Sequence, residues 1–371
     1  MHRHYWRSLD GLRAIAALIV LLSHAGAPFL PSGGVGVDIF FVLSGFLITT
    51  ILSGEINRYG GLRFGNFYMR RFLRLAPCLV LVAISYGLWV AFVEGRFPFA
   101  IVLVVLTYTT NWAMGIFGFE PHGLRHCWSL AIEEQYYLIW PLVILSLDRA
   151  TKSAWLKGTV LLILAGIVAS YRASVVGAFS AERIYFGLDT HSDGLIIGSS
   201  LAYFHAAISR SPHPVAERVC SFGIVPLAIA ILVGVISKIT WHDPEMGTFG
   251  FLIVAIAAAA IIADLVWSRS SWLARVLSLR PLVYLGTISY GLYLWHFPIY
   301  AAFNHYLPGR SFFQLGAWKV GVSILVAAIS YQWFERRFLE LKSRFQRPDP
   351  SDAASGVEAG SAVLAPDPGM R

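Results

Sequence analysis

Arg13 and His24 are the first residues whose types and spacing could do chemistry. The stretch from Ala14 to Gly54 is otherwise apolar, with His24 and Asp38 as its only ionisable side chains. Arg13 and His24 are eleven residues apart, which on a helix is about three turns and a rise of roughly 16 Å, so both point the same way. A histidine in such a segment is suited to be a general base, an acyl acceptor or a proton relay. The alternative is a neutral histidine bonded to a neighbouring helix.

Two adjacent carboxylates, Glu133 and Glu134, lie just inside another apolar segment. Neighbouring positions on a helix diverge by about 100°, so the two side chains cannot share one contact. We expect one of them to face a polar cavity and the other to pair with an arginine. The alternative is that they complement the positive end of the helix dipole, which explains one carboxylate more easily than two.

Three arginines, Arg70, Arg71 and Arg74, precede a further apolar segment. Arg70 and Arg74 are four residues apart and share a helix face. Clustered guanidinium groups bind phosphates through paired hydrogen bonds. The plainer interpretation is that they fix the membrane topology and contact anionic lipids. The spacing alone leaves both interpretations open.

Three aspartates and a second histidine are further candidates. Asp189 and Asp193 are four residues apart, and they either pair with arginines across the bundle or bind substrate hydroxyls. His296 lies in an aromatic run that is also typical of a membrane interface. We predict that Asp38, Asp189, Asp193 and His296 bind substrate. No metal site is predicted, because Asp189, His191 and Asp193 match no fixed ligand spacing.

These residues must be positioned by helices in a membrane, because the composition excludes a water-soluble domain. Of the 371 residues, 57% are apolar and only 13% are charged, whereas a soluble domain carries about 25% charged residues. An ordinary soluble enzyme, a disordered protein and a disulfide scaffold are thereby excluded. No basic soluble face is visible for a nucleic acid. The three cysteines are far apart and form neither a metal pattern nor a disulfide pattern.

The distribution of charge predicts the topology. A membrane span needs roughly 20 apolar residues, and the sequence offers eleven candidate segments. Lys and Arg outnumber Asp and Glu by 29 to 21, and they gather in clusters that the positive-inside rule places in the cytoplasm. One segment must then fail to cross, and 97–119 contains a polar run that suits a half helix against a cavity. The prediction is an all-α polytopic bundle of about ten transmembrane helices plus one re-entrant or half helix, with both termini cytoplasmic.

The same patterns divide the chain into a membrane domain, 1–347, and a C-terminal tail, 348–371. The tail is rich in Pro, Asp, Ser, Ala and Gly, which is typical of a disordered segment. We expect it to lie in the cytoplasm.

Five stretches together resemble the acyltransferase-3 family of bacterial membrane proteins, and they follow the family's order. They are residues 9–17 with His24, residues 36–48, residues 67–77, residues 128–137 with its Trp-Ser-Leu and Glu133, and residues 289–298 with His296 and Pro298. The resemblance extends to about residue 341. Two departures stand out: His191 occupies the arginine position of the family's Asp-x-Arg-x-Asp element, and Arg337 replaces the proline of a terminal Glu-x-Pro element. With a tail in place of an esterase-like domain, the chain resembles the stand-alone form.

This resemblance implies an O-acyltransferase of the bacterial inner membrane. Its expected donor is a cytoplasmic acyl-CoA, most often acetyl-CoA, and its acceptor is a hydroxyl of an envelope polysaccharide, a lipid-linked saccharide or a related glycan. The CoA phosphates would be bound by Arg70, Arg71 and Arg74. No nucleic acid and no metal are expected.

The catalytic group implied by the resemblance is His24, as a general base or a transient acyl carrier. Arg13 would position the donor or stabilise charge, and Glu133 would orient His24 or the sugar. The alternative from another class is a proton-coupled membrane transporter that uses the same buried groups as a relay. The acceptor glycan and the acyl length stay open.

Overall fold

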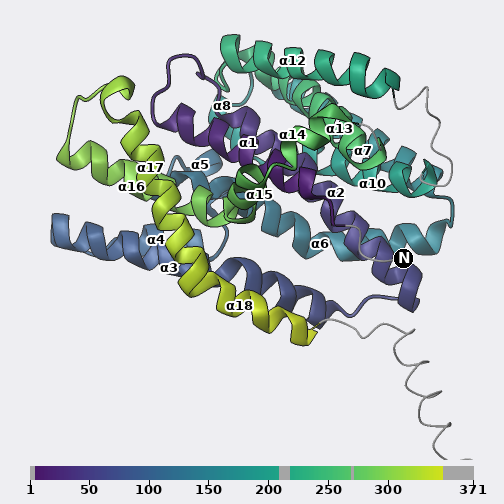
Figure 1. The fold of residues 1–371 in the computed structure, drawn as a ribbon, viewed down its shortest axis with the longest axis horizontal. Helices are drawn as coiled ribbons and strands as arrows, with labels where there is room; N and C mark the ends of the chain where they lie inside the picture. The colour runs from purple at the N-terminus through teal and green to yellow at the C-terminus, as the bar shows by residue number, and fades with distance from the viewer. Residues whose placement is uncertain (1–4, 209–217, 269–270, 346–371) are drawn as a thin grey trace, which may run out of the picture.

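The computed structural model describes residues 5–208, 218–268 and 271–345, and over these ranges it is helical without a β-strand (Figure 1). The predicted all-α class is confirmed, whereas the predicted tail at 348–371 lies outside the described residues. The elements in chain order are α1 (Arg7–His24), α2 (Gly34–Tyr59), α3 (Phe64–Glu94), α4 (Phe99–Leu106), α5 (Thr110–Phe117), η1 (His122–Cys127), α6 (Trp128–Ala150), α7 (Ala154–Val175), α8 (Ala181–Phe186), α9 (Leu188–His191), α10 (Asp193–Ile208), η2 (Cys220–Ile224), α12 (Val225–Lys238), η3 (Met246–Gly250), α13 (Phe251–Trp267), α14 (Trp272–Leu277), α15 (Arg280–Thr287), α16 (Ser289–Tyr306), α17 (Phe312–Ser330), η4 (Tyr331–Glu335), α18 (Arg336–Leu341) and η5 (Lys342–Phe345).

Seven of the described helices are long and apolar enough to cross a membrane. They are Gly34–Tyr59, Phe64–Glu94, His122–Ala150, Ala154–Val175, Cys220–Lys238, Met246–Trp267 and Phe312–Phe345. Three other segments expected to cross, α1, α10 and α16, are short or interrupted by polar side chains. These three pack among other helices, so their polar groups face protein rather than lipid. The fold is that of a multi-pass membrane protein, and the count of ten crossings stays a prediction.

The segment predicted as a half helix is broken in the middle. α4 and α5 meet at a bend of 117°, and Tyr108 at the bend has a left-handed φ of 54°. Each helix has eight residues and therefore rises about 12 Å, which is less than half of the roughly 30 Å hydrocarbon core. The hydroxyls of Thr107 and Thr109 donate to the Leu103 and Val104 carbonyl oxygens at the end of α4, which also accept the backbone N–H groups of the same two threonines.

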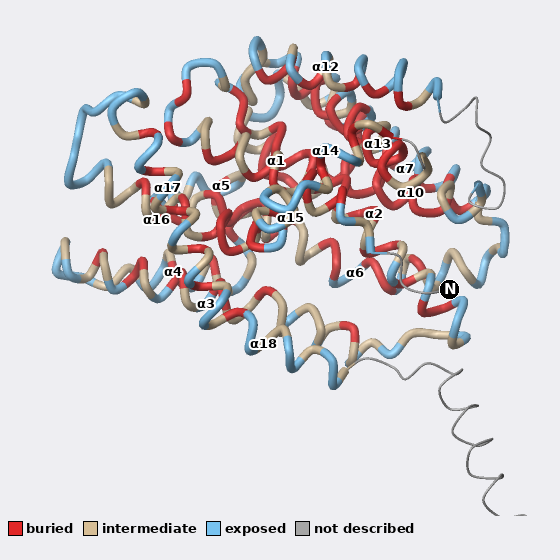
Figure 2. The backbone as a smooth tube through the Cα atoms, in the orientation of Figure 1, coloured by how far each residue is buried: buried red, intermediate tan, exposed pale blue. Residues whose placement is uncertain are grey.

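Two buried helices, α2 and α10, pack against each other in the centre of the bundle (Figure 2). Glycines bring their backbones together. A Cβ at Gly45 would lie 1.9 Å from the Leu195 carbonyl oxygen, and one at Gly198 would lie 2.0 Å from that of Val42. Small residues allow this approach between membrane helices, and they fix α2 as one wall for the site beside it.

α1 is held by the same kind of contact at its N-terminal end. A Cβ at Gly11 would lie 1.9 Å from the Leu277 carbonyl oxygen, and one at Gly286 would lie 1.8 Å from that of Asp10. Further along, α1 packs on α2 and α16. These contacts fix the position of Arg13 on one turn and carry His24, at the end of the helix, to the neighbourhood of α16.

Candidate active site

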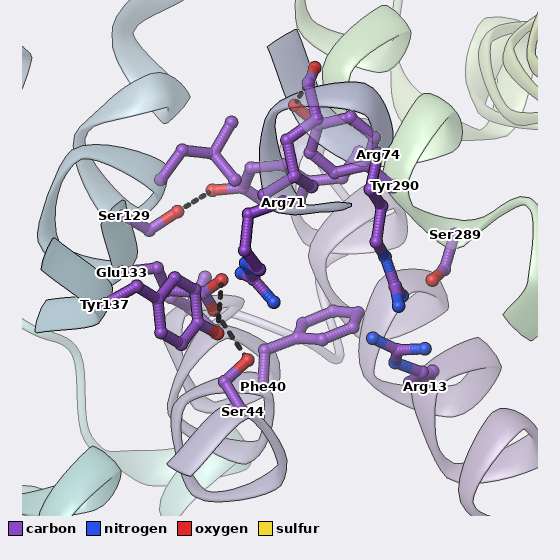
Figure 3. A pocket seen from close by; sticks show the side chains of 14 residues that line it. Arg13, Phe40, Ser44, Arg71, Arg74, Ser129, Glu133, Tyr137, Ser289 and Tyr290 are labelled. Carbon is purple, nitrogen blue, oxygen red and sulfur yellow. Dashed lines mark hydrogen bonds between the residues drawn. The ribbon is translucent and has the colours of Figure 1, made fainter. Parts of the chain in front are cut away.

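A pocket opens between α1, α2, α3, α6 and α16 (Figure 3). We call it the arginine pocket. It is lined by Arg13, Val37, Phe40, Ser44, Arg71, Arg74, Leu75, Ser129, Leu130, Glu133, Tyr137, Ser289, Tyr290 and Tyr293. Each of the five sequence stretches singled out above contributes to this lining, although they are spread over nearly 290 positions (9–298). The fold therefore gathers them around one cavity.

Arg13 and Arg74 bring positive charge into the pocket with little to balance it. Their guanidinium groups lie near each other beside the Phe40 ring (Figure 3), and the charge of Arg13 is the strongest electrostatic influence on Arg74. Arg13 lies 3.6 Å from Asp10, and its Nε has no hydrogen-bond partner. Within the described part of the chain, Arg74 makes no ion pair or hydrogen bond. Like charges held together in a partly buried site favour an anion between them.

The third arginine of the pocket, Arg71, is held firmly in place. Its guanidinium group lies 3.3 Å from a carboxylate oxygen of Glu134 and 3.6 Å from the centre of the Tyr137 ring. Its Nε nevertheless has no partner. Arg71 therefore presents an unused donor from a rigid position, which suits recognition of an anion of fixed geometry.

The two adjacent glutamates diverge as their helical positions require. Glu134 pairs with Arg71, whereas Glu133 lines the pocket. The Glu133 carboxylate accepts a hydrogen bond from the Ser44 hydroxyl at 3.1 Å and one from the Tyr137 hydroxyl at 3.4 Å. Glu133 thus lies with Arg13 and Arg71 on the pocket side of the site.

Arg70 lies outside the arginine pocket. Its guanidinium group donates to the Glu55 carboxylate at 3.0 Å and to the Phe345 carbonyl oxygen at 2.8 Å. These bonds tie the start of α3 to the end of α2 and to the last described turn. Of the three arginines grouped by sequence, the structure brings Arg71 and Arg74 together with Arg13 and turns Arg70 away.

His24 belongs to a second group, which we call the histidine cluster: His24, His126 and His296. The Nδ1 atom of His24 lies 3.1 Å from Nε2 of His296, and the rings of His126 and His296 have centroids 5.0 Å apart. His126 and His296 are buried, whereas His24 at the end of α1 is exposed. The charged residue that acts most strongly on His24 is Arg125. An exposed imidazole backed by a buried one is a suitable place for proton transfer.

Tyr293 lies between the arginine pocket and the histidine cluster. It lines the pocket, and its ring also contacts His126 and His296, at centroid distances of 5.2 and 5.4 Å. Its hydroxyl donates to the His126 carbonyl oxygen at 2.8 Å, so at 2.7 Å it accepts from the Ser129 hydroxyl. The two halves of the site thus share one wall.

The aspartates expected to bind substrate are engaged with other side chains. Asp193 accepts two hydrogen bonds from the buried Arg172, at 2.8 and 2.9 Å. Asp189 accepts two from Arg183, at 2.9 and 2.7 Å. This hydrogen bonding raises the pKa of the Arg183 guanidinium, so that group stays charged. The pairing with arginines, one of the two alternatives for these residues, is what the structure shows.

Asp38 is bonded to the histidine that replaces the family's arginine. The Nε2 atom of His191 lies 2.8 Å from a carboxylate oxygen of Asp38, and its Nδ1 atom donates to the Tyr185 carbonyl oxygen at 2.7 Å. Both side chains are buried. This Asp38–His191 pair and the Arg172–Asp193 pair occupy the interior between α2, α7 and α10. Within the described ranges, no group of three His, Cys, Asp or Glu side chains could hold a metal ion.

Three residues of the site, and Arg172 of the interior pair, were missed from the sequence. His126 lies in the short η1 turn that precedes the apolar helix α6, so it is not one of the ionisable residues inside an apolar segment. Arg172 stands at the end of a span, where it resembles a topology signal. Ser44 and Tyr137 are uncharged. Their position in the sequence could have identified two of them, because His126 and Tyr137 lie on either side of the Trp-Ser-Leu stretch.

Comparison with known proteins gives the arrangement a context. Residues 6–332 match the family model described as an acyltransferase domain. The Bacillus subtilis protein named "Putative peptidoglycan O-acetyltransferase YrhL" is 34% identical over 353 residues, which are 90% of this chain and 55% of that protein. The Listeria monocytogenes protein named "Peptidoglycan O-acetyltransferase OatA" is 30% identical over 350 residues, 90% of this chain and 56% of that protein. The chain spans a little over half the length of these curated relatives. No solved structure matches the chain.

Proposed function

Because the chain belongs to the acyltransferase family whose domain its residues 6–332 match, we propose that it transfers an acetyl group from an acyl-CoA donor to a hydroxyl group of an envelope glycan. The names of the relatives point to peptidoglycan as the first acceptor to test. The observation that carries the proposal is that Arg13, Arg71 and Arg74 line one pocket in which Glu133 is the only carboxylate of the described lining. Such a pocket needs an anionic ligand.

The donor phosphates would occupy the arginine pocket. Guanidinium groups bind phosphate oxygens in pairs, and Arg13, Arg71 and Arg74 offer such groups from two helices. This assignment replaces Arg70 of the sequence-based set with Arg13, since Arg70 is bonded to Glu55 and Phe345. The arginines at the start of α3 mark the cytoplasmic side by the positive-inside rule, which supports a cytoplasmic donor and cytoplasmic termini.

The acyl group would be transferred at His24. The pantetheine arm of the donor would extend past Tyr293, which requires the Ser129–Tyr293 hydrogen bond to open. The His24 imidazole takes the proton of the acceptor hydroxyl while the hydroxyl oxygen attacks the thioester carbonyl carbon. A C–O bond forms, the C–S bond breaks, and the proton passes to the CoA sulfur. The products are the glycan ester and the free thiol of CoA.

The experiment supplies radiolabelled acetyl-CoA to membranes that contain the protein and a peptidoglycan or lipid-linked glycan acceptor. We expect label in the glycan with the native protein and a loss of at least about a hundredfold with His24→Ala, since general base catalysis contributes about 10² to 10⁴. The amount of protein in the membrane serves as the control for folding. Full activity of His24→Ala would overturn the mechanism.

The same experiment separates the proposal from the alternative of a proton-coupled transporter. A transporter would use the histidine cluster as a relay and leave acetyl-CoA intact. Proton or solute flux without transfer of label would favour it. Transfer of label to a glycan other than peptidoglycan would keep the acyltransferase and change only the acceptor.

A further inference from the structure

His296 is a buried histidine whose hydrogen bonds define which of its nitrogen atoms carries a proton. The Nδ1 atom faces the Tyr293 backbone carbonyl oxygen in a short hydrogen bond. A carbonyl oxygen can only accept, so Nδ1 carries the hydrogen. The ring is fully buried and is packed against Tyr293, Tyr300 and Phe297. In the part of the chain that the structure describes, no carboxylate lies within ion-pair distance of it, so no negative charge there favours a second proton on the ring.

The other nitrogen of His296 faces His24. With Nδ1 protonated in a neutral ring, Nε2 of His296 offers a lone pair. The atom 3.1 Å away is Nδ1 of His24, which must then be the donor. His24 is thereby held as the tautomer with hydrogen on Nδ1 and a lone pair on Nε2. The assignment follows because the Tyr293 carbonyl oxygen, which begins this series of hydrogen bonds, can only accept.

We infer that His296 is the positioning residue of His24: it fixes the tautomer and ring orientation that leave Nε2 of His24 as the atom that receives a proton. In the Ser-His-Asp triad a carboxylate has this task. Here the task falls to a buried imidazole that is itself anchored on a backbone carbonyl. The inference rests on the proposed function of His24 and gives His296 a different role from the substrate binding expected from the sequence.

The packing around the pair supports this role. The rings of His24 and His296 are stacked at a centroid distance of 5.3 Å with an interplanar angle of 19°, and the Phe297 ring meets His24 edge-on at 5.0 Å. His24 is the last residue of α1, where a side chain has few neighbours on its own helix. Contacts from α16 therefore set its orientation.

Substitution of His296 by glutamine or by asparagine tests its two hydrogen bonds separately. The side chain of glutamine reaches about as far as Nε2 of histidine, whereas that of asparagine reaches about as far as Nδ1. His296→Gln can therefore keep an acceptor for His24, and His296→Asn keeps only the group that faces Tyr293. His296→Leu is an apolar control that fills the space without either bond.

The test combines kinetics with a direct measurement of the tautomer. With acetyl-CoA and a glycan acceptor, we expect kcat to fall by at least about tenfold in His296→Leu and His296→Asn, with KM for acetyl-CoA within about twofold of the native value. His296→Gln should recover much of kcat. If His296 had a purely structural role, all three variants would be less abundant in the membrane, and kcat of His296→Gln would not exceed that of the other two.

The tautomer itself is measured by nitrogen-15 NMR of the histidine-labelled full-length native protein in lipid, with the His24 signals identified by their absence from His24→Gln. We expect an unprotonated Nε2 and a protonated Nδ1 on His24. A protonated Nε2 would overturn the inference whatever the activity, and so would a His296→Leu variant with native kcat. Activity in His24→Ala would instead overturn the proposed function, so the two failures are distinguishable.

Discussion

The arginine pocket and the interior pair Arg172–Asp193 both bring guanidinium groups into an apolar bundle, but they treat the charge in opposite ways. Arg172 is fully buried and donates to both oxygens of Asp193 and to the carbonyl oxygens of Gly247 and Thr190. Among the described residues, Arg74 makes no ion pair or hydrogen bond, and the one ion-pair contact of Arg13 is that with Asp10 at 3.6 Å. A buried charge is tolerated where it is paired and hydrogen-bonded. The interior pair meets that condition within the protein, whereas the proposed anionic donor would meet it for Arg13 and Arg74.

This difference separates structural charges from functional ones more reliably than burial does. Asp38, Asp189 and Asp193 have the residue type and the apolar surroundings expected of substrate ligands, yet each is bonded to a basic side chain of its own chain. We therefore propose the ligand site from unmatched charge rather than from charge alone.

The largest effect is expected when the matched pair is broken. Arg172→Ala leaves the buried Asp193 carboxylate without its partner, which costs about 3–5 kcal/mol. We expect little folded protein in the membrane and a Tm in detergent well below that of the native protein. Arg172→Ala combined with Asp193→Ala removes both charges and should recover part of the loss. Native stability of the single variant would show that the pair is dispensable and would weaken the comparison.

A substitution in the arginine pocket should affect substrate binding and leave the stability of the protein unchanged or higher. Arg74→Gln removes a guanidinium group that makes no ion pair or hydrogen bond with a described residue and lies near the like charge of Arg13, so the free energy of unfolding should hold or rise. Loss of a charged hydrogen bond to a phosphate is worth about 1.5–3 kcal/mol, or roughly a 10- to 100-fold increase in KM for acetyl-CoA.

Arg70→Gln is the matched control for Arg74→Gln. It removes the same charge from the same helix, but Arg70 is bonded to Glu55 and Phe345 outside the pocket. We expect KM for acetyl-CoA to stay within about twofold of the native value and stability to fall slightly. Equal increases in KM for the two variants would show that the arginines act as a diffuse positive field rather than as a built site.

Much of this arrangement could be predicted from the sequence. The five stretches that resemble the family do converge on one site, because each carries polar groups that lipid would reject and that must therefore face the interior. Of the two residues that the spacing puts on one side of α1, Arg13 lines the arginine pocket and His24 lies against His296. The segment expected to be a half helix is bent by 117° within its polar run, and there the hydroxyls of Thr107 and Thr109 bond to carbonyl oxygens of α4.

The remainder depends on partners that sequence spacing does not reveal. Arg70 and Arg74 share a helix face, yet Glu55 from the preceding helix reaches only Arg70. His296 carries the residue type of a substrate ligand, and only the fold shows that it backs His24. The number of membrane crossings could not be predicted from composition for a related reason. The helices α1, α10 and α16 pack against other helices, so their polar side chains contact protein and their hydropathy does not show whether they cross the bilayer.

The smallest effect is expected at Asp189, which gives the sharpest test of the rule that matched charges are structural. Asp189 is bonded to Arg183, but its side chain is 39% exposed, and ion pairs at such positions contribute about 0.2–1 kcal/mol. Asp189→Asn keeps the shape and an acceptor oxygen while removing the charge. We expect a Tm within a few degrees of the native value and unchanged KM values for both substrates. An increase of tenfold or more in KM for the glycan, at native stability, would instead identify Asp189 as a substrate ligand despite its partner, because only an interaction with the acceptor could produce that selective change.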